Sequence, residues 1–586
     1  MVALRWLFFG LVLATTASAM SRLWEILRVD GLDTSEMLFL ALVAILFCWI
    51  SISFWIFCIG AYARWRGISG NTLTRPRDSD PQLRASLSRT ALVFPVRNEE
   101  PGRFFAGISA VIASIRKNGV LDRFDFYILS DSTAPSNCSA EGEGYRRLHE
   151  TSGATIYYRC RLENTGRKSG NIADFCRNWG SLYDYMVVLD ADSLMTAETL
   201  VALVRLMDNN PRTALIQVSP QLVGRDSLFA RIQQFSSSVY GPIYSAGLAL
   251  LQGPDGNYWG HNAIIRIQPF MQNCGLPELP GRAPLGGEIM SHDFVEAALL
   301  RRAGWELHLA TDLGGSYEEP PPTLVDYMKR DRRWCQGNLQ HLRLIFAQGF
   351  RIESRGHLAT GVMSYLSSPL WVAMLVASAA MMLVQRHIAP VTYLGRYPIL
   401  SWPESHTIEF VALISAMVVL LYGPKLIALL LILRDREACR AHGGGWNAAF
   451  SVLLESVFST LLAPIAMLSQ SMFVINILLG EATGWGTQQR TEHGPAWSII
   501  VRTFGMHTFV AITAGVLIYT YVPGSFWWFS LLLVGPVLAI PFAGITSSRS
   551  IGQWAMRRGL FLAPCETGRI PIIDLVRSRM HDATLL

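Results

Sequence analysis

Long charge-free apolar stretches alternate with a mixed polar segment along this chain. Residues 37–63 and 356–385 are two such stretches, and 410–433 is a third that only Lys425 interrupts. About twenty apolar residues cross a bilayer, and an unpaired charge at its centre costs several kcal/mol, so these stretches predict transmembrane helices. The intervening residues, 64–355, have the charge density of a globular domain.

Two further apolar stretches follow. Residues 448–480 contain Glu455 and Pro464, and residues 503–548 contain no Asp, Glu, Lys or Arg but have a Pro-Gly turn near their middle. We expect 448–480 to form two short segments hinged near the proline, which gives about eight spans in total. One long tilted helix is the alternative.

The first twenty residues fit two interpretations. An apolar run followed by Ala17-Ser18-Ala19, with Arg5 before it, resembles either a signal peptide or a first transmembrane helix. We favour the retained helix. Either interpretation places the basic residues that follow the second span, Arg64 and Arg66 among them, on the cytoplasmic side by the positive-inside rule.

Composition supports a membrane protein with one large soluble part. The chain has 586 residues with a formal net charge of +6, and 51% of its residues are hydrophobic while only 16% are charged. A soluble domain has about 25% charged residues, and intrinsic disorder is incompatible with so much apolar sequence. The nine cysteines show no CxxC pairing, so neither a zinc site nor a disulfide framework is indicated.

The soluble part alternates predicted strands and helices. Residues 90–95, 124–129 and 185–189 are short apolar runs typical of buried strands, while 104–117 has helical periodicity. In an open parallel sheet, ligands bind at the carboxyl ends of the strands. An α/β domain with its site at those strand ends is therefore expected.

Polar residues cluster where these strands end. The segments 97–100 and 130–132 follow the first two strands, and Asp190 and Asp192 follow the third. Two carboxylates at this spacing can both reach a hard divalent cation, which prefers oxygen ligands. The sequence therefore predicts a Mg2+ or Mn2+ site at Asp190 and Asp192.

Three more features add candidate chemistry. Lys168 and Asn171 place a cation and a glycine-flexed backbone where a pyrophosphate could bind. Asp293 precedes a predicted helix over 294–302 and could deprotonate a hydroxyl, although it could equally cap that helix. The segment 330–338 joins three guanidinium groups to an indole, as would a basic interfacial helix.

These elements, in this order, resemble the processive family-2 glycosyltransferases, which include cellulose and hyaluronan synthases. More specifically, they resemble the glucan biosynthesis glucosyltransferase H family of bacterial inner membranes. The motifs that carry the resemblance are FPVRNEEP at 94–101, LSDST at 129–133, RKSGNIADFC at 167–176, VLDADS at 188–193, YWGHN at 258–262 and RDRRWCQGN at 330–338.

The chain departs from the family pattern at three places. The usual Thr-Glu-Asp of the catalytic base is Ser291-His292-Asp293 here, and the first Gln of the Gln-x-x-Arg-Trp motif is Arg330. The N-terminal part is also shorter than the long cytoplasmic extension of some members.

The resemblance implies a GT-A-like cytoplasmic glycosyltransferase domain inserted between α-helical transmembrane segments. The implied divisions are 1–63 for the N-terminal membrane helices, 64–355 for the catalytic domain, 356–548 for a channel region with a gating-like loop at 481–497, and 549–586 for a cytoplasmic tail.

The resemblance also implies a role for individual residues. Asp293 is the implied catalytic base, and Asp190 and Asp192 the implied metal ligands. Nucleotide-sugar contacts are implied for Glu99, Asp131, Lys168, Asn171, Asp190, Arg333 and Trp334, acceptor contacts for Tyr258, Trp259, His261 and Trp334, and gating contacts for Thr487, Gln488, Gln489 and Arg490.

The implied activity is processive, inverting transfer of glucose from UDP-glucose to the β-1,2-linked backbone of osmoregulated periplasmic glucans, with translocation across the inner membrane. The implied partners are UDP-glucose, the growing glucan, membrane lipid, acyl carrier protein and periplasmic glucan biosynthesis protein G. The alternatives are a polymerase with another linkage or donor, a lipid-phosphate sugar synthase, and a transporter that senses nucleotide sugars.

Overall fold

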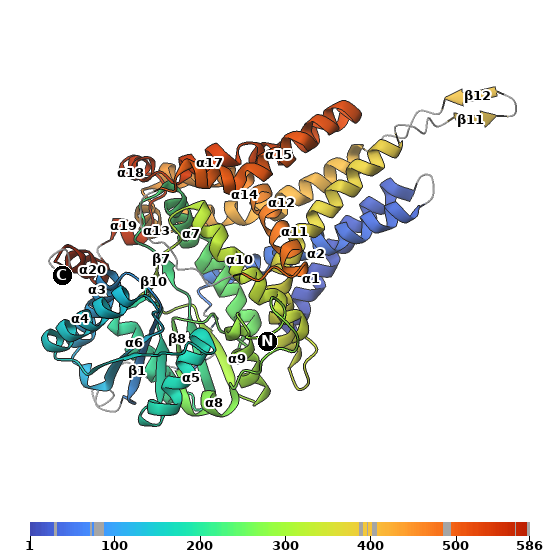
Figure 1. Cartoon of the computed structure of the whole chain (residues 1–586). Helices are drawn as coiled ribbons and strands as arrows, with labels where there is room; N and C mark the ends of the chain where they lie inside the picture. Colours follow the sequence, from blue (N-terminus) through green and yellow to red (C-terminus); the bar gives the residue numbers. More distant parts are fainter. Residues whose placement is uncertain are drawn as a thin grey trace.

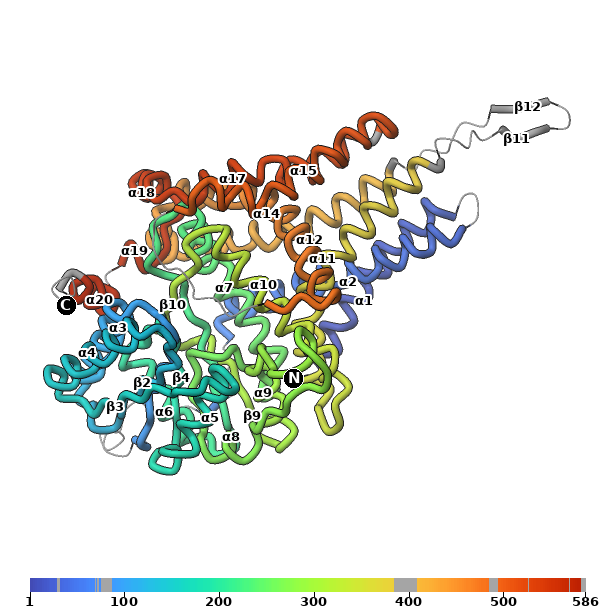
Figure 2. Tube along the Cα trace, viewed as in Figure 1, coloured from blue at the N-terminus to red at the C-terminus, as the bar shows by residue number. Residues whose placement is uncertain are grey.

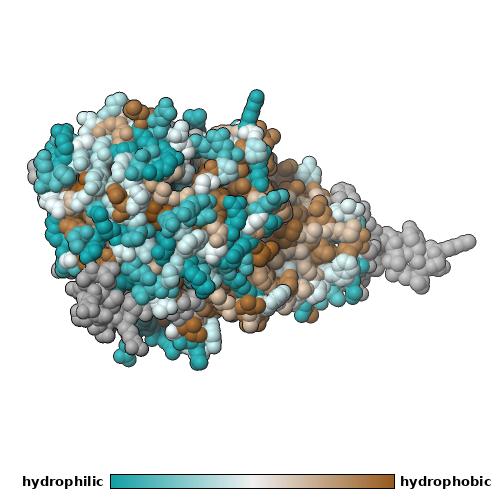
Figure 3. Space-filling model, turned by 90° about the horizontal axis from the view of Figure 1, so that it is seen from below, coloured by the Kyte–Doolittle hydropathy of each residue, from teal (hydrophilic) through white to brown (hydrophobic). Residues whose placement is uncertain are grey.

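The computed structural model describes residues 1–28, 32–68, 70, 73–74, 87–385, 391–394, 397–400, 407–483, 494–568 and 570–582. Long helices extend from one side of an α/β domain, and the C-terminal helices return to that domain (Figure 1). The apolar surface lies mainly on the extending helices, whereas the α/β domain is mostly hydrophilic (Figure 3). A membrane protein with one large soluble domain is therefore confirmed.

The long apolar helices are α1 (Val2–Leu27), α2 (Thr34–Arg66), α11 (Ile352–Gln385), α12 (Thr407–Arg434), α14 (Gly445–Leu478) and α15 (Trp497–Tyr521). Within the described residues, six helices are long and apolar enough to cross a membrane, and the bent pair α16 (Phe526–Val537) and α17 (Ala539–Thr546) allows a seventh crossing. The expected turn between α15 and α16 is present as a short 3-10 helix, η6 (Pro523–Ser525). Between α11 and α12 lies a small hairpin, β11 (Val391–Leu394) and β12 (Tyr397–Leu400).

The expectation that residues 448–480 break into two segments is wrong. They form the single 34-residue helix α14, with Pro464 inside it, which accounts for the difference from eight spans. A proline removes only one intrahelical hydrogen bond, and continuous helix satisfies the other backbone groups of an apolar segment. Near its start, Ser451 Oγ accepts a hydrogen bond from Phe561 N, and just beyond its end, Glu481 pairs with Arg332.

Both ends of α14 therefore contact elements on the side of the α/β domain. Its last turns pack Val474 and Ile477 against Cys335 and Leu339 of α10 (Leu324–Gln340). Since both ends lie on that side, the chain stays there after α14 without a break at the proline, and α14 is a candidate span only by its length and composition.

A seven-stranded sheet forms the centre of the α/β domain, in the order β3-β2-β1-β4-β8-β6-β9. Its strands are β1 (Thr90–Val96), β2 (Phe124–Ser130), β3 (Ile156–Cys160), β4 (Tyr185–Val188), β6 (Thr213–Val218), β8 (Ala263–Arg266) and β9 (Glu306–Ala310). Only β8 runs antiparallel to its neighbours. The strands expected at 90–95, 124–129 and 185–189 are confirmed as β1, β2 and β4.

Helices cover both faces of this sheet. They are α3 (Pro101–Lys117), α4 (Pro135–Ser152), α5 (Arg167–Trp179), α6 (Ala197–Asn209), α8 (Ile267–Asn273) and α9 (His292–Arg302). A smaller sheet of β5 (Leu194–Met195), β10 (Ser316–Glu318) and β7 (Gln221–Leu222) lies beside the large one. The short 3-10 helices of the domain are η3 (Leu121–Arg123), η4 (Gly180–Leu182) and η5 (His341–Arg343).

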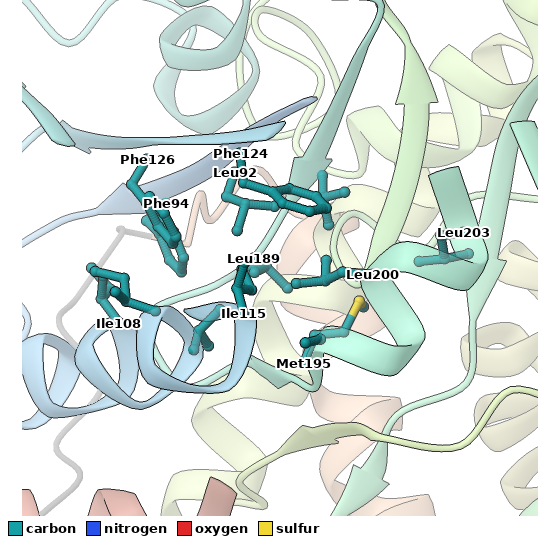
Figure 4. Packing of buried hydrophobic residues seen from close by; sticks show 14 of the residues in the cluster. Leu92, Phe94, Ile108, Ile115, Phe124, Phe126, Leu189, Met195, Leu200 and Leu203 are labelled. Atoms are coloured by element: carbon teal, nitrogen blue, oxygen red, sulfur yellow. The ribbon is translucent and has the colours of Figure 1, made fainter. Parts of the chain in front are cut away.

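Alternate strand residues supply the core on the α3 and α6 face. Leu92 and Phe94 of β1 and Phe126 of β2 pack against Ile108 and other apolar residues of the covering helices (Figure 4). Successive side chains of a strand point to opposite faces, so alternate residues of each strand enter this core. The polar residues that follow each strand lie beyond its carboxyl end, outside the core. The core thereby fixes the position of the functional loops.

Two helices connect the domain to the membrane part. The first, α7 (Leu228–Gln252), packs closely on α2: a Cβ added at Gly60 would lie 1.9 Å from the carbonyl oxygen of Ile243. Glycine at this position lets the two backbones approach. The second is α10, which packs on α11 and α14.

The first helix is tied to the α/β domain at its start. Arg5 of α1 donates to Asp255 Oδ2 at 2.7 Å and to the carbonyl oxygens of Leu251 and Gln252. The rest of α1 packs on α2 and α12. In this structure α1 therefore packs as one of the apolar helices, and its retention stays a prediction.

A buried charge pair joins three helices of the membrane part. Lys425 Nζ of α12 lies 2.8 Å from Glu455 Oε2 of α14 and donates to Ser459 Oγ at 2.6 Å. Tyr240 OH of α7 donates to the same carboxylate oxygen at 2.8 Å. The two charges that interrupt the apolar stretches thus neutralise one another.

The C-terminal residues belong structurally to the α/β domain. They form α18 (Arg549–Arg557), α19 (Pro564–Thr567) and α20 (Pro571–Asp582). A short helix that directly follows α12, α13 (Arg436–Ala441), packs beside α19. The buried Arg231 of α7 binds both carboxylate oxygens of Glu566. Ile572 and Ile573 of α20 are buried in the same core as α3, beside which α20 lies (Figure 2).

Candidate active site

A cavity of about 690 Å³ opens at the carboxyl ends of β1, β2 and β4. It is bounded on one side by these strand ends and on the other by α10 and the start of α9. The predicted residues that line it are Glu99, Asp131, Lys168, Asn171, Asp190, Asp192, Trp259, His261, Asp293, Arg333 and Trp334. One cavity therefore collects side chains from positions 99 to 334 of the chain.

The ends of β1 and β2 form the wall at Asp131. Arg161 binds this carboxylate through Nε at 2.7 Å and Nη2 at 2.6 Å. Asn98, which has a φ of 52°, accepts hydrogen bonds from the backbone N–H groups of Thr133 and Ala134 and so links the two loops. Asn171 donates to the carbonyl oxygen of Leu129 at 2.9 Å, which anchors α5 to the same strand.

A cation and two carboxylates meet at the centre of the cavity. Lys168 Nζ pairs with Asp190 Oδ1 and donates to the carbonyl oxygen of Gly260 at 2.9 Å. Gly260 has a φ of +88°, and a Cβ there would lie 3.3 Å from Asp293 Oδ2. Because Gly260 has no Cβ, the side chains of Lys168 and Asp293 can both approach the backbone at this residue, and Lys168 also pairs with Asp190.

The donor set at Asp190 and Asp192 fits a hard divalent cation. Both side chains line the cavity, and the ammonium group of Lys168 already supplies positive charge beside Asp190. Among the described residues no group of three His, Cys, Asp or Glu side chains could hold a metal ion. Two protein carboxylates leave coordination positions for phosphate oxygens, as is usual for Mg2+.

Asp293 is half-buried at the start of α9. Burial raises its pKa, the neighbouring His292 lowers it, and Glu296 raises it again. His292 Nδ1 lies 3.1 Å from Glu296 Oε1. Burial disfavours the imidazolium, but the charge and hydrogen bond of Glu296 outweigh it and raise the pKa of His292.

The helix α10 presents the guanidinium and indole groups. Trp334 is 49% exposed and lines the cavity, and the guanidinium carbon of Arg330 lies 4.5 Å from its ring centroid. Arg333 also lines the cavity. The Arg at position 330, where the family motif has Gln, therefore stacks on the motif's tryptophan.

Two groups of predicted residues are not placed in the cavity. Tyr258 is only 1% exposed and does not line it, so the structure does not support direct contact of this ring with an acceptor. Thr487, Gln488, Gln489 and Arg490 lie outside the described residues.

Several residues that sequence reasoning missed also belong to the site. Gln217 of β6 accepts from Trp259 N at 3.0 Å and so holds the loop at 258–262. Glu318 of β10 lies 3.4 Å from His261 Nε2, and burial raises its pKa. A Tyr-Glu-Glu-Pro segment shortly before a basic helix was the only sequence signal for Glu318.

Comparison with known proteins agrees with this geometry. Residues 185–431 match the family described as "Glycosyl transferase family group 2". A mannosyltransferase from Pyrobaculum calidifontis, solved with GDP-Man and Mn2+, is 16% identical with a TM-score of 0.38, over 66% of this chain and 99% of its own. The match over residues 185–431 indicates a glycosyltransferase domain in a chain that also has long apolar helices.

Curated relatives narrow the assignment. Glucans biosynthesis glucosyltransferase H of Cupriavidus pinatubonensis is 43% identical over 580 residues, which is 98% of this chain and 67% of the relative. The Pseudomonas aeruginosa protein of the same name is 44% identical over 534 residues, covering 90% of this chain and 61% of its own length. The chain belongs to the glucans biosynthesis glucosyltransferase H family.

Proposed function

We propose that this protein is a processive, inverting glucosyltransferase that extends the β-1,2-linked backbone of osmoregulated periplasmic glucans from UDP-glucose. One observation carries the proposal: a single cavity contains Asp131, Lys168, Asp190, Asp192 and Asp293 together with residues of α10 that include Arg333 and Trp334. A protein that only sensed nucleotide sugars would not need a base at the position of Asp293.

In the proposed reaction, Asp293 takes the proton of the terminal acceptor hydroxyl as that oxygen attacks the anomeric carbon of the donor. The new glycosidic bond forms as the bond between the anomeric carbon and the diphosphate oxygen breaks. UDP leaves with the electron pair of that bond, and the configuration at the anomeric carbon inverts. No covalent enzyme intermediate is required.

The other charged groups of the cavity would bind the donor and stabilise its diphosphate. Lys168 and Arg333 face the position where negative charge develops on the departing diphosphate and would stabilise it. Asp190 and Asp192 would hold Mg2+ or Mn2+, which when bound supplies further charge stabilisation to the diphosphate. Asp131, fixed by Arg161, would bind the uridine side of the donor.

The acceptor side would use flat aromatic surfaces. Trp334 and Trp259 both line the cavity, and an indole face can stack on a sugar ring. His261 would bind an acceptor hydroxyl. The helices that border α10 would lead the glucan across the membrane.

We further propose that the α/β domain and the C-terminal helices face the cytoplasm of a bacterial inner membrane. Arg64 and Arg66 end α2 on the domain side, and Arg434 ends α12 there, with its guanidinium carbon 5.8 Å from the Trp65 ring centroid. Clustered Arg beside an interfacial tryptophan is typical of the cytoplasmic leaflet. Acyl carrier protein and periplasmic glucan biosynthesis protein G are candidate partners on the two sides of that membrane.

The test of this function is UDP release by the purified protein in nanodiscs. UDP-glucose, UDP-galactose, UDP-N-acetylglucosamine and GDP-mannose are compared with and without Mg2+, and linkage analysis follows. Metal-dependent turnover of UDP-glucose to a β-1,2-glucan is expected. Another donor or a β-1,4 product would contradict the proposed substrate or linkage, and binding of UDP-glucose without turnover would favour a sensor.

The pH profile should show the raised pKa of Asp293. The base acts as a carboxylate, so kcat/KM should fall as the pH drops through a pKa above the ordinary value of about 4. The measurement is kcat/KM for UDP-glucose between about pH 4 and 8, with each sample returned to neutral pH to exclude unfolding. A reversible profile that stays flat down to about pH 4 would contradict the assignment of Asp293 as base.

Replacing Asp192 by Asn should weaken the response to metal. The variant keeps the shape of the side chain but loses one anionic ligand, so the Mn2+ concentration for half-maximal UDP release should rise by at least about tenfold. Mn2+ binding measured by electron paramagnetic resonance with UDP present gives a readout independent of turnover. The exposed Asp184, changed to Asn, is the matched control, and an unchanged Mn2+ requirement in Asp192→Asn would remove it from the ligand set.

A further inference from the structure

Three buried polar side chains lie together near the C-terminal end of α10 and at the residue that follows it. Gln336, Gln340 and His341 are each at most 4% exposed. Trp334 lies two residues before Gln336 and six before Gln340 on the same helix. Buried amide and imidazole groups are costly unless they are hydrogen-bonded, so their partners show what they hold in place.

All three side chains bind the backbone of the segment 284–291, which leads into Asp293. Gln340 Oε1 accepts from Met290 N at 2.9 Å, while its Nε2 donates to the carbonyl oxygens of Pro284 at 3.2 Å and Glu288 at 3.1 Å. Gln336 Nε2 donates to Pro284 O at 3.1 Å. One side-chain amide thus meets backbone groups at three points of the segment.

His341 contacts the residue after Met290, which is one position closer to Asp293 along the chain. Its Nε2 lies 3.1 Å from the carbonyl oxygen of Ser291. Burial lowers the pKa of His341 to about 4, so the ring is neutral at pH 7 and donates this hydrogen bond through Nε2. Gly337, between Gln336 and Gln340, lies so close to the same segment that a Cβ there would be 2.2 Å from Ser291 Oγ.

The other side of the same segment is tied to the donor side of the cavity. Glu288 accepts from Gly166 N at 2.9 Å and pairs with Arg167 Nε at 3.1 Å, next to Lys168. The segment 284–291 is therefore held between the loop that begins α5 and the last turns of α10. Its backbone position is fixed from both directions.

We propose that Gln340 and His341 are positioning residues that fix Asp293 relative to Arg333 and Trp334. The proposal rests on the proposed function, in which Asp293 is the base and α10 carries groups that contact the substrates. Arg333 and Trp334 lie on α10, and the segment before Asp293 is hydrogen-bonded to Gln340 and His341 at the end of the same helix. These two residues, called the clamp below, therefore set the distance between Asp293 and the groups that bind the substrates. A displacement of about 1 Å in such an arrangement costs on the order of 10²-fold in rate.

The test compares Gln340→Met and His341→Phe with His341→Gln in the full-length protein in nanodiscs. Met and Phe keep the volume and lose the hydrogen bonds, whereas the Gln amide can still donate to Ser291 O. Lys329→Met, at an exposed position of α10, is the control. The readouts are kcat, KM for UDP-glucose, UDP affinity by calorimetry, and hydrogen exchange of the peptide that spans 288–293.

In Gln340→Met and His341→Phe we expect kcat to fall by tenfold to a hundredfold, with KM and UDP affinity changed less than twofold. His341→Gln should recover most of the kcat. Exchange of the Met290 amide should quicken in Gln340→Met. Unchanged kcat in both variants, or equal losses in His341→Gln and His341→Phe, would overturn the proposal. If the wild-type protein released no UDP, the proposed function would fail, and the exchange at Met290 would by itself support or overturn the clamp.

Discussion

Changing Asp293 to Asn should slow glucosyl transfer by about 10²- to 10⁴-fold while UDP affinity stays within twofold of the wild type. The amide keeps the shape of the carboxylate but cannot accept the acceptor proton. Asp293 lies beside Gly260 at the start of α9, whereas Asp131 follows β2 and is bound by Arg161. The loss should therefore appear in kcat and leave nucleotide binding intact.

UDP release and UDP binding, measured on the same preparation, check this result. The matched control is Asp122→Asn, because the Asp122 side chain is 70% exposed and pairs only with its neighbour Arg123 among the contacts shown. Turnover by Asp293→Asn close to that of the control would remove Asp293 from the role of base. Loss of UDP binding together with turnover would indicate a structural role instead.

Replacing Lys425 by Met should destabilise the membrane part by about 3 kcal/mol. The substitution leaves Glu455 with a buried negative charge and only the hydroxyl of Tyr240 to stabilise it, and breaking a buried ion pair from one side costs about 3–5 kcal/mol. Removing both charges in Lys425→Met/Glu455→Gln should recover most of the loss. The pair would then be a means of joining α7, α12 and α14 and not a net source of stability.

Thermal unfolding in detergent, followed by circular dichroism, measures both variants. Lys117→Met, on the exposed end of α3, is the control for loss of one lysine. A double variant no more stable than Lys425→Met would show that the ion pair itself contributes, and an unchanged midpoint in the single variant would show that Glu455 finds another partner.

The parts of the fold that depend on local pattern could be predicted from the sequence. Apolar runs of four to seven residues in β1, β2 and β4, and charge-free runs in the membrane helices, each report burial directly. The site followed from one rule, that polar residues at the carboxyl ends of parallel strands meet. Asp131, Asp190 and Asp192 were found in this way and line one cavity.

The features that depend on distant contacts could not be predicted. Pro464 looked like a break because the sequence does not show that α16 packs closely on α14 at Leu461 and Pro464, or that α10 and α11 pack on its last turns. Tyr258 was expected to contact the acceptor because the motif YWGHN at 258–262 resembles the family, but adjacent residues on an extended segment point in opposite directions, and only Trp259 of the two lines the cavity. Arg161 and Glu318 have no motif around them, and only the packing of β3 and β10 brings them to the site.

The placement of α20 also governs the order in which this protein can fold during synthesis. Ile572 and Ile573 fill the core under α3, whose own residues leave the ribosome more than four hundred and fifty residues earlier. Domains generally fold from the N-terminal end as they are made, yet this one cannot close its α3 face until the membrane helices between have been inserted. A ribosome that stalls before residue 571 therefore leaves the apolar residues of the α3 face without the side chains of α20 that cover them.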